Sequence, residues 1–316
     1  MSSNIIRSPL IAKFQKNLTS KFLLTRHGES FYQKKHREIY HIKNKNAQEY
    51  SRQIKEIRYD PDLCDCEITE NGKNESYYAG KRLNELNIKY VFCSPLTRAL
   101  QSCQYILKGY TDNNTNEKIN KKPKVIVHPL IFEKIETNSD IISNIYRSMS
   151  AFPEFDWSEF SKLNQETLPI YMLKYCDTII NMKTNTIKFS NDNPYFNLCF
   201  NHYKKNLEFN HQEILLKAME ELNEQNSFIE SSIKTYDRLL EFKTFVKNFL
   251  KENNLKNDER ILMVGHSILF KHLATNLIYE DTFDPVEIDE NYIHLDNAQM
   301  ASLYFDDEIL FRNLRV

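Results

Sequence analysis

The chain has 316 residues, of which 41% are hydrophobic and 27% charged, and its 42 Lys and Arg residues nearly balance its 43 Asp and Glu residues. These values are typical of a globular protein with a sizeable core, and a net charge of -1 excludes a general attraction to nucleic acid or to anionic membranes. The apolar runs are far shorter than the roughly 20 residues that cross a bilayer, so we expect no transmembrane segment.

Residues 1–20 lack the continuous apolar core and the small-residue cleavage site of a secretory signal. They contain three basic residues and no acidic one, which fits either a plain chain terminus, the favoured interpretation, or a mitochondrial targeting segment. We therefore expect a cytoplasmic protein. Its six cysteines are scattered without zinc-finger spacing, so we expect reduced thiols and no metal site.

The first half of the chain alternates between predicted strands and helices. Residues 22–25 form a short apolar strand that leads directly into Arg26 and His27. A helix is expected over about 69–86 with Thr69 as its N-cap, followed by a strand at 90–93. Ser94 and Pro95 then indicate the N-cap and first residue of another helix. A polar surface loop at 108–122 precedes a third strand at 125–127.

The second half begins with a long segment, about 131–230, that contains no glycine and that we interpret as a largely helical insertion, with one helix at 213–222. A long amphipathic helix follows from Ser231 to Leu250. A fourth strand at 260–264, a helix at 267–277 and a hairpin with arms at 299–305 and 308–312 complete the predicted elements.

This alternation predicts a single α/β domain, residues 1–316, with helices on both faces of a mostly parallel sheet and the insertion as a lid. Ligands of such sheets bind beyond the carboxyl ends of the strands. Three predicted strands end in groups that can contact an anion. These groups are Arg26 with His27, Ser94 with Arg98, and Gly265 with His266.

Together these side chains offer what phosphoryl transfer without a metal requires. His27 can attack phosphorus through a neutral ring nitrogen. Arg26 and Arg98 can each hold phosphate oxygens with a planar fork of donors. His266 can donate to the charge that develops in the transition state.

The motifs that carry these residues resemble those of the histidine phosphatase superfamily (branch 1). The run RHGES at 26–30 resembles the first signature block, SPLTRALQS at 94–102 the second and GHS at 265–267 the third. ITENG at 68–72 and LDNAQM at 295–300 are similar to two further family segments. The resemblance implies a three-layer αβα, phosphoglycerate-mutase-like fold and a phosphohistidine intermediate on His27.

Residues 128–142 and 152–156 look most like the eukaryotic phosphoglycerate-mutase-like subgroup. That alignment implies that Glu133 is the proton donor, and Glu136 and Asp140, which are close in sequence, are the alternatives. Gln33 stands at the Asn position of the mutase motif and is a candidate phosphate contact. At 31–33 the chain departs from the mutase pattern, which favours a phosphatase over a bisphosphate-primed phosphoglycerate mutase.

We therefore predict a phosphoric monoester hydrolase that acts on a small phosphorylated substrate, with no cofactor and no nucleic-acid or membrane partner. From a different functional class, the alternative is a catalytically weak module that binds a phosphorylated ligand or a partner protein.

Overall fold

A six-stranded sheet forms the centre of the computed structural model, which describes residues 21–40, 42–43, 46–112, 122–166, 168–176, 178–181, 187–189, 226–274, 295–304 and 312–314. Its strands are β1 (Phe22–Arg26), β2 (Asn87–Cys93), β3 (Lys124–Val127), β7 (Glu259–Gly265), β8 (Met300–Tyr304) and β9 (Arg312–Leu314), in the order β3-β2-β7-β1-β8-β9. The first four in this order are parallel, whereas β8 and β9 are antiparallel to their neighbours. The predicted mostly parallel sheet is confirmed, and β9 begins where the predicted second hairpin arm ends.

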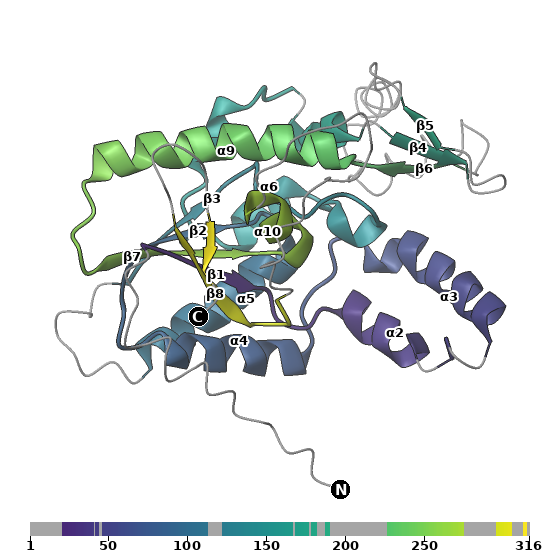
Figure 1. The fold of residues 1–316 in the computed structure, drawn as a ribbon, viewed down its shortest axis with the longest axis horizontal. Coiled ribbons are helices and arrows are strands. Elements are labelled where there is room, and N and C mark those ends of the chain that lie inside the picture. Colours follow the sequence, from purple (N-terminus) through teal and green to yellow (C-terminus); the bar gives the residue numbers. More distant parts are fainter. Residues whose placement is uncertain are drawn as a thin grey trace, which may run out of the picture.

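Helices cover both faces of this sheet (Figure 1). Helices α4 (Glu70–Arg82) and α5 (Thr97–Thr111) lie on one face, and α9 (Ser232–Asn253) and α10 (Ser267–Ala274) lie on the other. Because successive strand residues point to opposite faces, the buried strands supply two cores. In β2, for example, Val91 and Cys93 pack in the core with α4 and α5, and Phe92 packs in the core with α9. The predicted three-layer α/β fold is confirmed.

The predicted N-cap Thr69 is present in the structure, and Ser231 is an N-cap that was not predicted. The hydroxyl of Thr69 accepts a hydrogen bond from the backbone N–H of Gly72 at 3.1 Å, at the start of α4. The hydroxyl of Ser231 accepts one from the N–H of Lys234 at 3.1 Å, at the start of α9. Each bond satisfies an amide that would otherwise have no partner within its helix.

The predicted start of α5 is wrong. The helix begins at Thr97 rather than Pro95, and the carboxylate of Asp65 accepts the Thr97 N–H at 2.8 Å. Leu96 holds the N-cap position, and the hydroxyl of Ser94 instead accepts the N–H of Leu96 at 3.3 Å and lies 2.7 Å from Nε2 of His266. The polar segment that we expected to be a loop from 108 onward is also still helical as far as Thr111.

The segment between 131 and 230 is not purely helical. Its described residues contain one short α-helix, α6 (Ile145–Ala151), and the 3-10 helices η3 (Asn138–Asp140), η4 (Ser158–Lys162) and η5 (Leu168–Tyr175). It also contains an antiparallel sheet of β4 (Thr178–Asn181), β5 (Ile187–Phe189) and β6 (Asn226–Ile229). The β-branched residues at 178–180 favour a strand, a signal that the helical interpretation missed. The helix expected at 213–222 lies outside the described residues.

Two further helices, α2 (Phe31–Tyr40) and α3 (Ala47–Tyr59), lie beyond the end of β1 and were not predicted (Figure 1). Asn46 caps α3 by accepting the N–H of Glu49 at 3.0 Å. Apolar residues of α3, such as Ile54 and Ile57, pack against Leu63 in the 3-10 helix η1 (Pro61–Leu63). This helical pair thus forms a wall at the carboxyl edge of the parallel strands.

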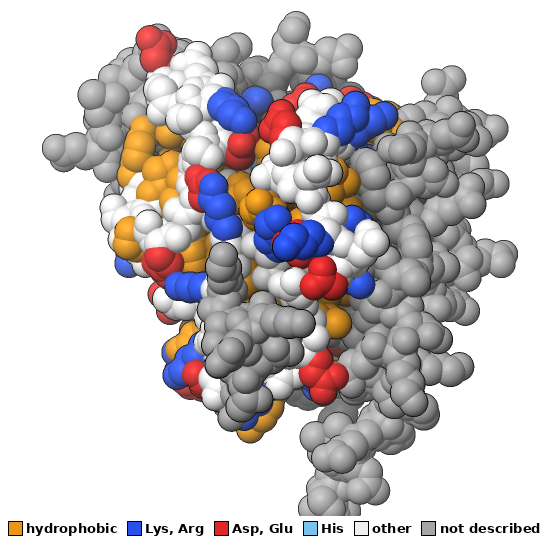
Figure 2. All heavy atoms as spheres, turned by 90° about the vertical axis from the view of Figure 1, so that its left-hand side faces the viewer, with side chains coloured by type: hydrophobic (Ala, Val, Ile, Leu, Met, Phe, Trp, Pro, Cys, Tyr) orange, Lys and Arg blue, Asp and Glu red, His pale blue; other side chains and the backbone are white. Residues whose placement is uncertain are grey.

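The face of the molecule on the left of Figure 1 has a mixed surface. Figure 2 shows basic and acidic side chains interspersed over its described part. Among the described helices, none combines the length and the apolar character needed to cross a membrane.

Candidate active site

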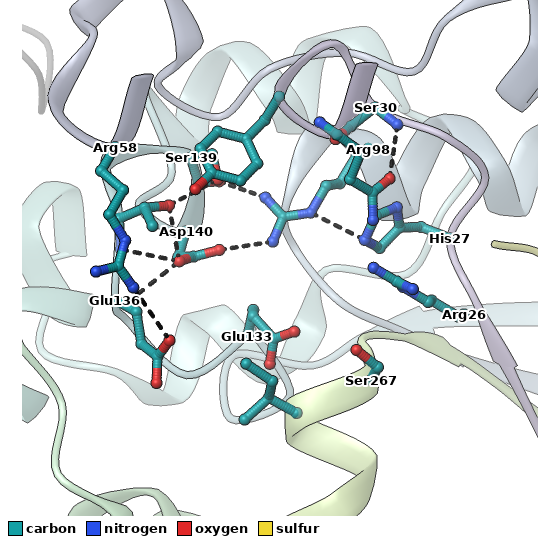
Figure 3. Close-up of a pocket in the computed structure, with 14 residues that line it drawn as sticks. Arg26, His27, Ser30, Arg58, Arg98, Glu133, Glu136, Ser139, Asp140 and Ser267 are labelled. Atoms are coloured by element: carbon teal, nitrogen blue, oxygen red, sulfur yellow. Dashed lines mark hydrogen bonds and ion pairs between the residues drawn. The ribbon is translucent and has the colours of Figure 1, made fainter. Parts of the chain in front are cut away.

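A pocket lies at the carboxyl edge of the parallel strands (Figure 3). Its lining includes five of the six predicted site residues, namely Arg26, His27, Gln33, Arg98 and Glu133. The sixth, His266, is fully buried and does not line the pocket, but its ring centroid lies only 5.2 Å from that of His27. The structure therefore brings the predicted residues together from β1, α2, α5, the loop after β3 and the end of β7.

His27 is buried directly after β1, and its backbone N–H donates to the carbonyl of Gly265 at 3.0 Å. Its Nδ1 lies 2.7 Å from the carbonyl oxygen of Gly28. Because a carbonyl oxygen can only accept, Nδ1 must carry the proton, which leaves a lone pair on Nε2. Burial, followed by the charges of Arg98 and Arg26, holds the pKa of His27 well below its usual range. This favours a neutral ring at neutral pH, with its lone pair on Nε2.

The loop that carries His27 is packed closely against α4. A Cβ atom on Gly28 would lie 2.2 Å from the carbonyl oxygen of Gly72, so no larger residue fits there without backbone movement. The N–H of Gly28 also donates to the hydroxyl of Ser102 at 2.9 Å. These contacts fix the turn that follows His27.

Arg98 lies in the first turn of α5 and is nearly completely buried. Its Nε donates to Nε2 of His27 at 3.3 Å, and one terminal nitrogen pairs with the carboxylate of Asp140 at 2.9 Å. The other terminal nitrogen donates to the carbonyl of Ser139. The guanidinium group thus connects His27 to the loop before α6.

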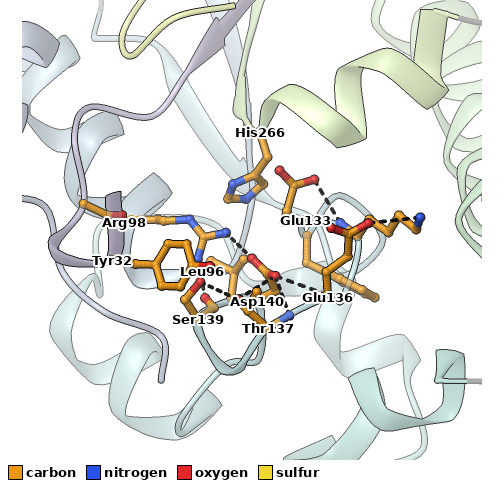
Figure 4. Close-up of polar contacts among 12 residues, drawn as sticks. Tyr32, Leu96, Arg98, Glu133, Glu136, Thr137, Ser139, Asp140 and His266 are labelled. Carbon is orange, nitrogen blue, oxygen red and sulfur yellow. Dashed lines mark hydrogen bonds and ion pairs between the residues drawn. The ribbon is translucent and has the colours of Figure 1, made fainter. Parts of the chain in front are cut away.

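Asp140 is buried and accepts hydrogen bonds on both carboxylate oxygens (Figure 4). Oδ1 pairs with Arg98, and Oδ2 accepts from the N–H groups of Glu136 and Thr137 at 3.2 and 3.0 Å and from the Thr137 hydroxyl at 3.0 Å. Asp140 therefore neutralises and orients Arg98. This carboxylate was considered in sequence only as an alternative acid.

Glu133 follows β3 and is buried in the pocket wall. Its Oε1 accepts the N–H of Lys134 at 2.9 Å and the N–H of Leu269, in the first turn of α10, at 2.8 Å. Since both bonds go to Oε1, Oε2 is the oxygen suited to carry a proton. Burial, followed by the negative charge of Asp140, raises the pKa of Glu133 to about 7.

His266 follows β7 and lies beneath the pocket, where its Nε2 is 2.7 Å from the hydroxyl of Ser94. Figure 4 shows its ring pointing toward the cluster of Arg98, Asp140 and Glu133. Its buried Nδ1 has no hydrogen-bond partner within the described part of the chain. Burial, followed by the charge of Arg98, holds its pKa well below the usual range.

The remaining predicted residues, Arg26 and Gln33, have additional structural partners. One terminal nitrogen of Arg26 donates to the carbonyl of Leu295 at 2.9 Å. The side-chain oxygen of Gln33 accepts the Ser30 N–H at 2.9 Å, and the Ser30 hydroxyl accepts the Gln33 N–H at 3.4 Å. Because this reciprocal capping of α2 uses the side-chain oxygen of Gln33, the side-chain NH2 group is the donor that remains for the pocket.

Sequence reasoning missed Arg58 and Tyr32, which also line the pocket. Arg58 lies in the last turn of α3, and its guanidinium is 3.8 Å from the carboxylate of Glu136. Burial and the charge of Asp140 raise the pKa of Tyr32 to about 12. Both residues come from the unpredicted pair α2 and α3, so the missing signal was the Asn46 cap that begins α3. Within the described residues, no cluster of three or more His, Cys, Asp or Glu side chains could hold a metal ion.

The chain is similar to several solved structures at low sequence identity. No curated protein matches the chain. Similar solved structures include an ecdysone phosphate phosphatase from Bombix mori with tungstate (11% identity, 93% of this chain and 92% of that chain covered, TM-score 0.43). A mycobacterial glucosyl-3-phosphoglycerate phosphatase with VO3 has 12% identity, covers 93% of this chain and 95% of its own, and gives a TM-score of 0.44. A phosphoserine phosphatase from Entamoeba histolytica with 3-phosphoglyceric acid has 12% identity, coverage of 93% and 94%, and a TM-score of 0.42.

Residues 52–119 match the model of the histidine phosphatase superfamily (branch 1), and this match contains the block with Ser94 and Arg98. The sheet order and the RHGES and GHS blocks at the strand ends agree with it. Over residues 52–119 the chain is therefore similar to branch 1 of the histidine phosphatase superfamily.

Proposed function

We propose that this chain is a phosphatase that hydrolyses a small phosphorylated substrate through a phosphohistidine intermediate on His27. The observation that carries the proposal is the state of the His27 ring. Its Nδ1 proton is committed to the carbonyl of Gly28, so the lone pair lies on Nε2, which accepts from Nε of Arg98 at the place where a phosphate would bind between two arginines.

In the first step, Nε2 of His27 attacks phosphorus while the bond between phosphorus and the leaving oxygen breaks. Glu133, in its protonated form, gives its proton to that oxygen. A pKa of about 7 supports this role, because an acid with that pKa still holds a proton near neutral pH. Arg26, Arg98 and His266 would stabilise the equatorial oxygens.

In the second step, water attacks the phosphohistidine and the Glu133 carboxylate accepts a proton from that water. The bond between phosphorus and Nε2 breaks, inorganic phosphate leaves, and the ring and the carboxyl return to their starting states. The buried Nδ1 of His266 would donate to a phosphate oxygen, since the described residues offer it no acceptor.

Steady-state assays with para-nitrophenyl phosphate and 3-phosphoglycerate, on the wild type and on His27→Ala, test this proposal. We expect release of inorganic phosphate by the wild type and none above background by His27→Ala. Isomerisation of 3-phosphoglycerate that depends on a bisphosphate would indicate a mutase instead. Binding of vanadate without turnover of any phosphoester would indicate a binding module.

A further inference from the structure

A buried ion pair, formed by Glu230 and Arg238, lies at the start of α9. Glu230 is 0% exposed and Arg238 is 1% exposed. The pair is bidentate, since Nε and one terminal nitrogen of Arg238 each donate to a different oxygen of Glu230 at 2.9 Å. Burying two charges costs several kcal/mol per ion before they interact, and apolar residues of similar size often give equal stability. A gain in stability therefore does not explain why this ion pair is buried here.

The pair binds the backbone on both sides of Glu133. Before Glu133, the second terminal nitrogen of Arg238 donates to the carbonyls of Leu130 and Phe132 at 2.5 and 3.0 Å. After it, the N–H of Ile135 donates to the Glu230 carboxylate at 3.2 Å, and the N–H of Glu230 donates to the carbonyl of Ile135 at 2.9 Å.

The guanidinium also stacks on a side chain of the same loop. Its central carbon lies 3.7 Å from the centroid of the Phe132 ring. Figure 1 shows that α9 runs along the sheet and that its last turn lies near the start of β7. Its first turn therefore lies toward the opposite edge of the sheet, where β7 ends and α10 begins. Glu133 in turn accepts the N–H of Leu269 in α10.

From this arrangement we propose that Glu230 and Arg238 are positioning residues that hold the loop of Glu133 so that its carboxyl group faces the leaving oxygen of the substrate. This inference rests on the proposed function, because it assigns the pair to the proton-transfer step. A general acid must lie within hydrogen-bond reach of the oxygen that it protonates, and small displacements reduce its contribution strongly.

The test uses Arg238→Lys, which keeps the charge but cannot bind two carboxylate oxygens and two carbonyls with a planar fork. We expect kcat for an alkyl phosphate to fall roughly tenfold, and kcat for para-nitrophenyl phosphate to fall less than about threefold, because only the former needs a proton donor. In a Glu133→Gln background, Arg238→Lys should leave the ratio of the two kcat values unchanged. Glu230→Gln is the second variant, with the same expected pattern.

Arg260→Lys is the matched control. Arg260 also donates to two backbone carbonyls, those of Asn257 and Glu259, but it lies at the far end of β7 from the site. This variant should leave the ratio of the two kcat values at the wild-type level. Equal losses on both substrates in Arg238→Lys, or a further drop of the ratio in the Glu133→Gln background, would overturn the proposal.

A measurement without substrate separates this inference from the proposed function. The protonated carboxyl of Glu133 absorbs in the infrared, and Glu133→Gln identifies its band. If the pair holds Glu133 in its buried position, the midpoint of this band should shift to lower pH in Arg238→Lys, since a loosened loop admits water. An unchanged midpoint contradicts the inference, whereas inactivity of the wild type on every phosphoester contradicts the proposed function.

Discussion

Glu133 and Asp140 are two buried acids in the same pocket, but they have different partners. Asp140 accepts on both oxygens and pairs with the guanidinium of Arg98, which opposes the rise of its pKa. Glu133 accepts two backbone amides on one oxygen, and the pKa of its carboxyl is raised to about 7. Glu133 is therefore the acid that retains a proton near neutral pH.

Replacing Glu133 with Gln removes this proton. We expect turnover of an alkyl phosphate to fall roughly a hundredfold or more, and turnover of para-nitrophenyl phosphate to change much less. In the wild type, kcat/KM for the alkyl phosphate should decline as the pH rises above about 7, because the acid loses its proton. Equal losses on both substrates would show that Glu133 positions the phosphate, and Glu136 would become the next candidate.

The raised pKa of Glu133 also affects the free energy of unfolding. Its folded-state pKa of about 7 exceeds its usual 4.5, so the folded state binds the proton more tightly and loses stability as the pH rises from 4.5 to 7. Glu133→Gln lacks this loss, so its stability relative to the wild type should increase over that range by on the order of 3 kcal/mol. Urea unfolding at pH 5 and pH 8 measures the difference. If the difference in free energy of unfolding between Glu133→Gln and the wild type is the same at both pH values, Glu133 is already charged in the folded protein at pH 5.

Asp140 competes with an incoming phosphate for Arg98, because its carboxylate occupies a terminal nitrogen of the guanidinium. An Asn side chain cannot accept all the hydrogen bonds of Asp140, since only one of its two terminal atoms is an acceptor. In Asp140→Asn, inhibition by vanadate should strengthen by roughly threefold to tenfold, because a negative charge is removed. At the same time kcat should fall, because Arg98 is less well oriented. A weaker binding of vanadate would contradict this role.

At the scale of elements, α4 and α5 cross at two glycines, which places their backbones in contact. A Cβ atom on Gly109 would lie 1.9 Å from the carbonyl oxygen of Tyr77, and one on Gly80 would lie 1.9 Å from that of Ile106. Gly109→Ala should therefore reduce the free energy of unfolding by roughly 1–3 kcal/mol. Urea unfolding measures this change, with Lys108→Ala, an exposed neighbour on the same helix, as the control. Equal stability of both variants would show that the two helices separate without cost.

Elements with a local signal were predicted well, and those that depend on distant partners were not. Thr69 caps α4 as expected, because the cap bonds an amide three residues later, and the long helix predicted from Ser231 is present as α9. The start of α5 was misplaced because its cap, Asp65, comes from another part of the chain. The strands β4–β6 have only three or four residues each, too few for a clear alternation. Helices α2 and α3 pack on each other through residues such as Ile39 and Ile57, a contact that no local pattern reports.

For the whole molecule, the order of strands and helices along the chain predicted the layers of the fold and the edge at which the site lies. The motif blocks identified His27, Arg98 and Glu133, because each stands in a recognisable run. They did not indicate that Asp140 binds Arg98, or that Glu230 and Arg238 hold the loop of Glu133. These contacts join residues about 40 to 110 positions apart, and no periodicity in the sequence reports them.

The central claim is that His27 carries the phosphoryl group, and rapid-quench labelling tests it most directly. The wild type is mixed briefly with a phosphoester labelled in its phosphoryl group, denatured, and analysed for label on the protein. We predict label on His27 that is released by acid, is stable to base and is absent from His27→Ala. Label on a serine, or turnover by His27→Ala at the wild-type rate, would contradict the account.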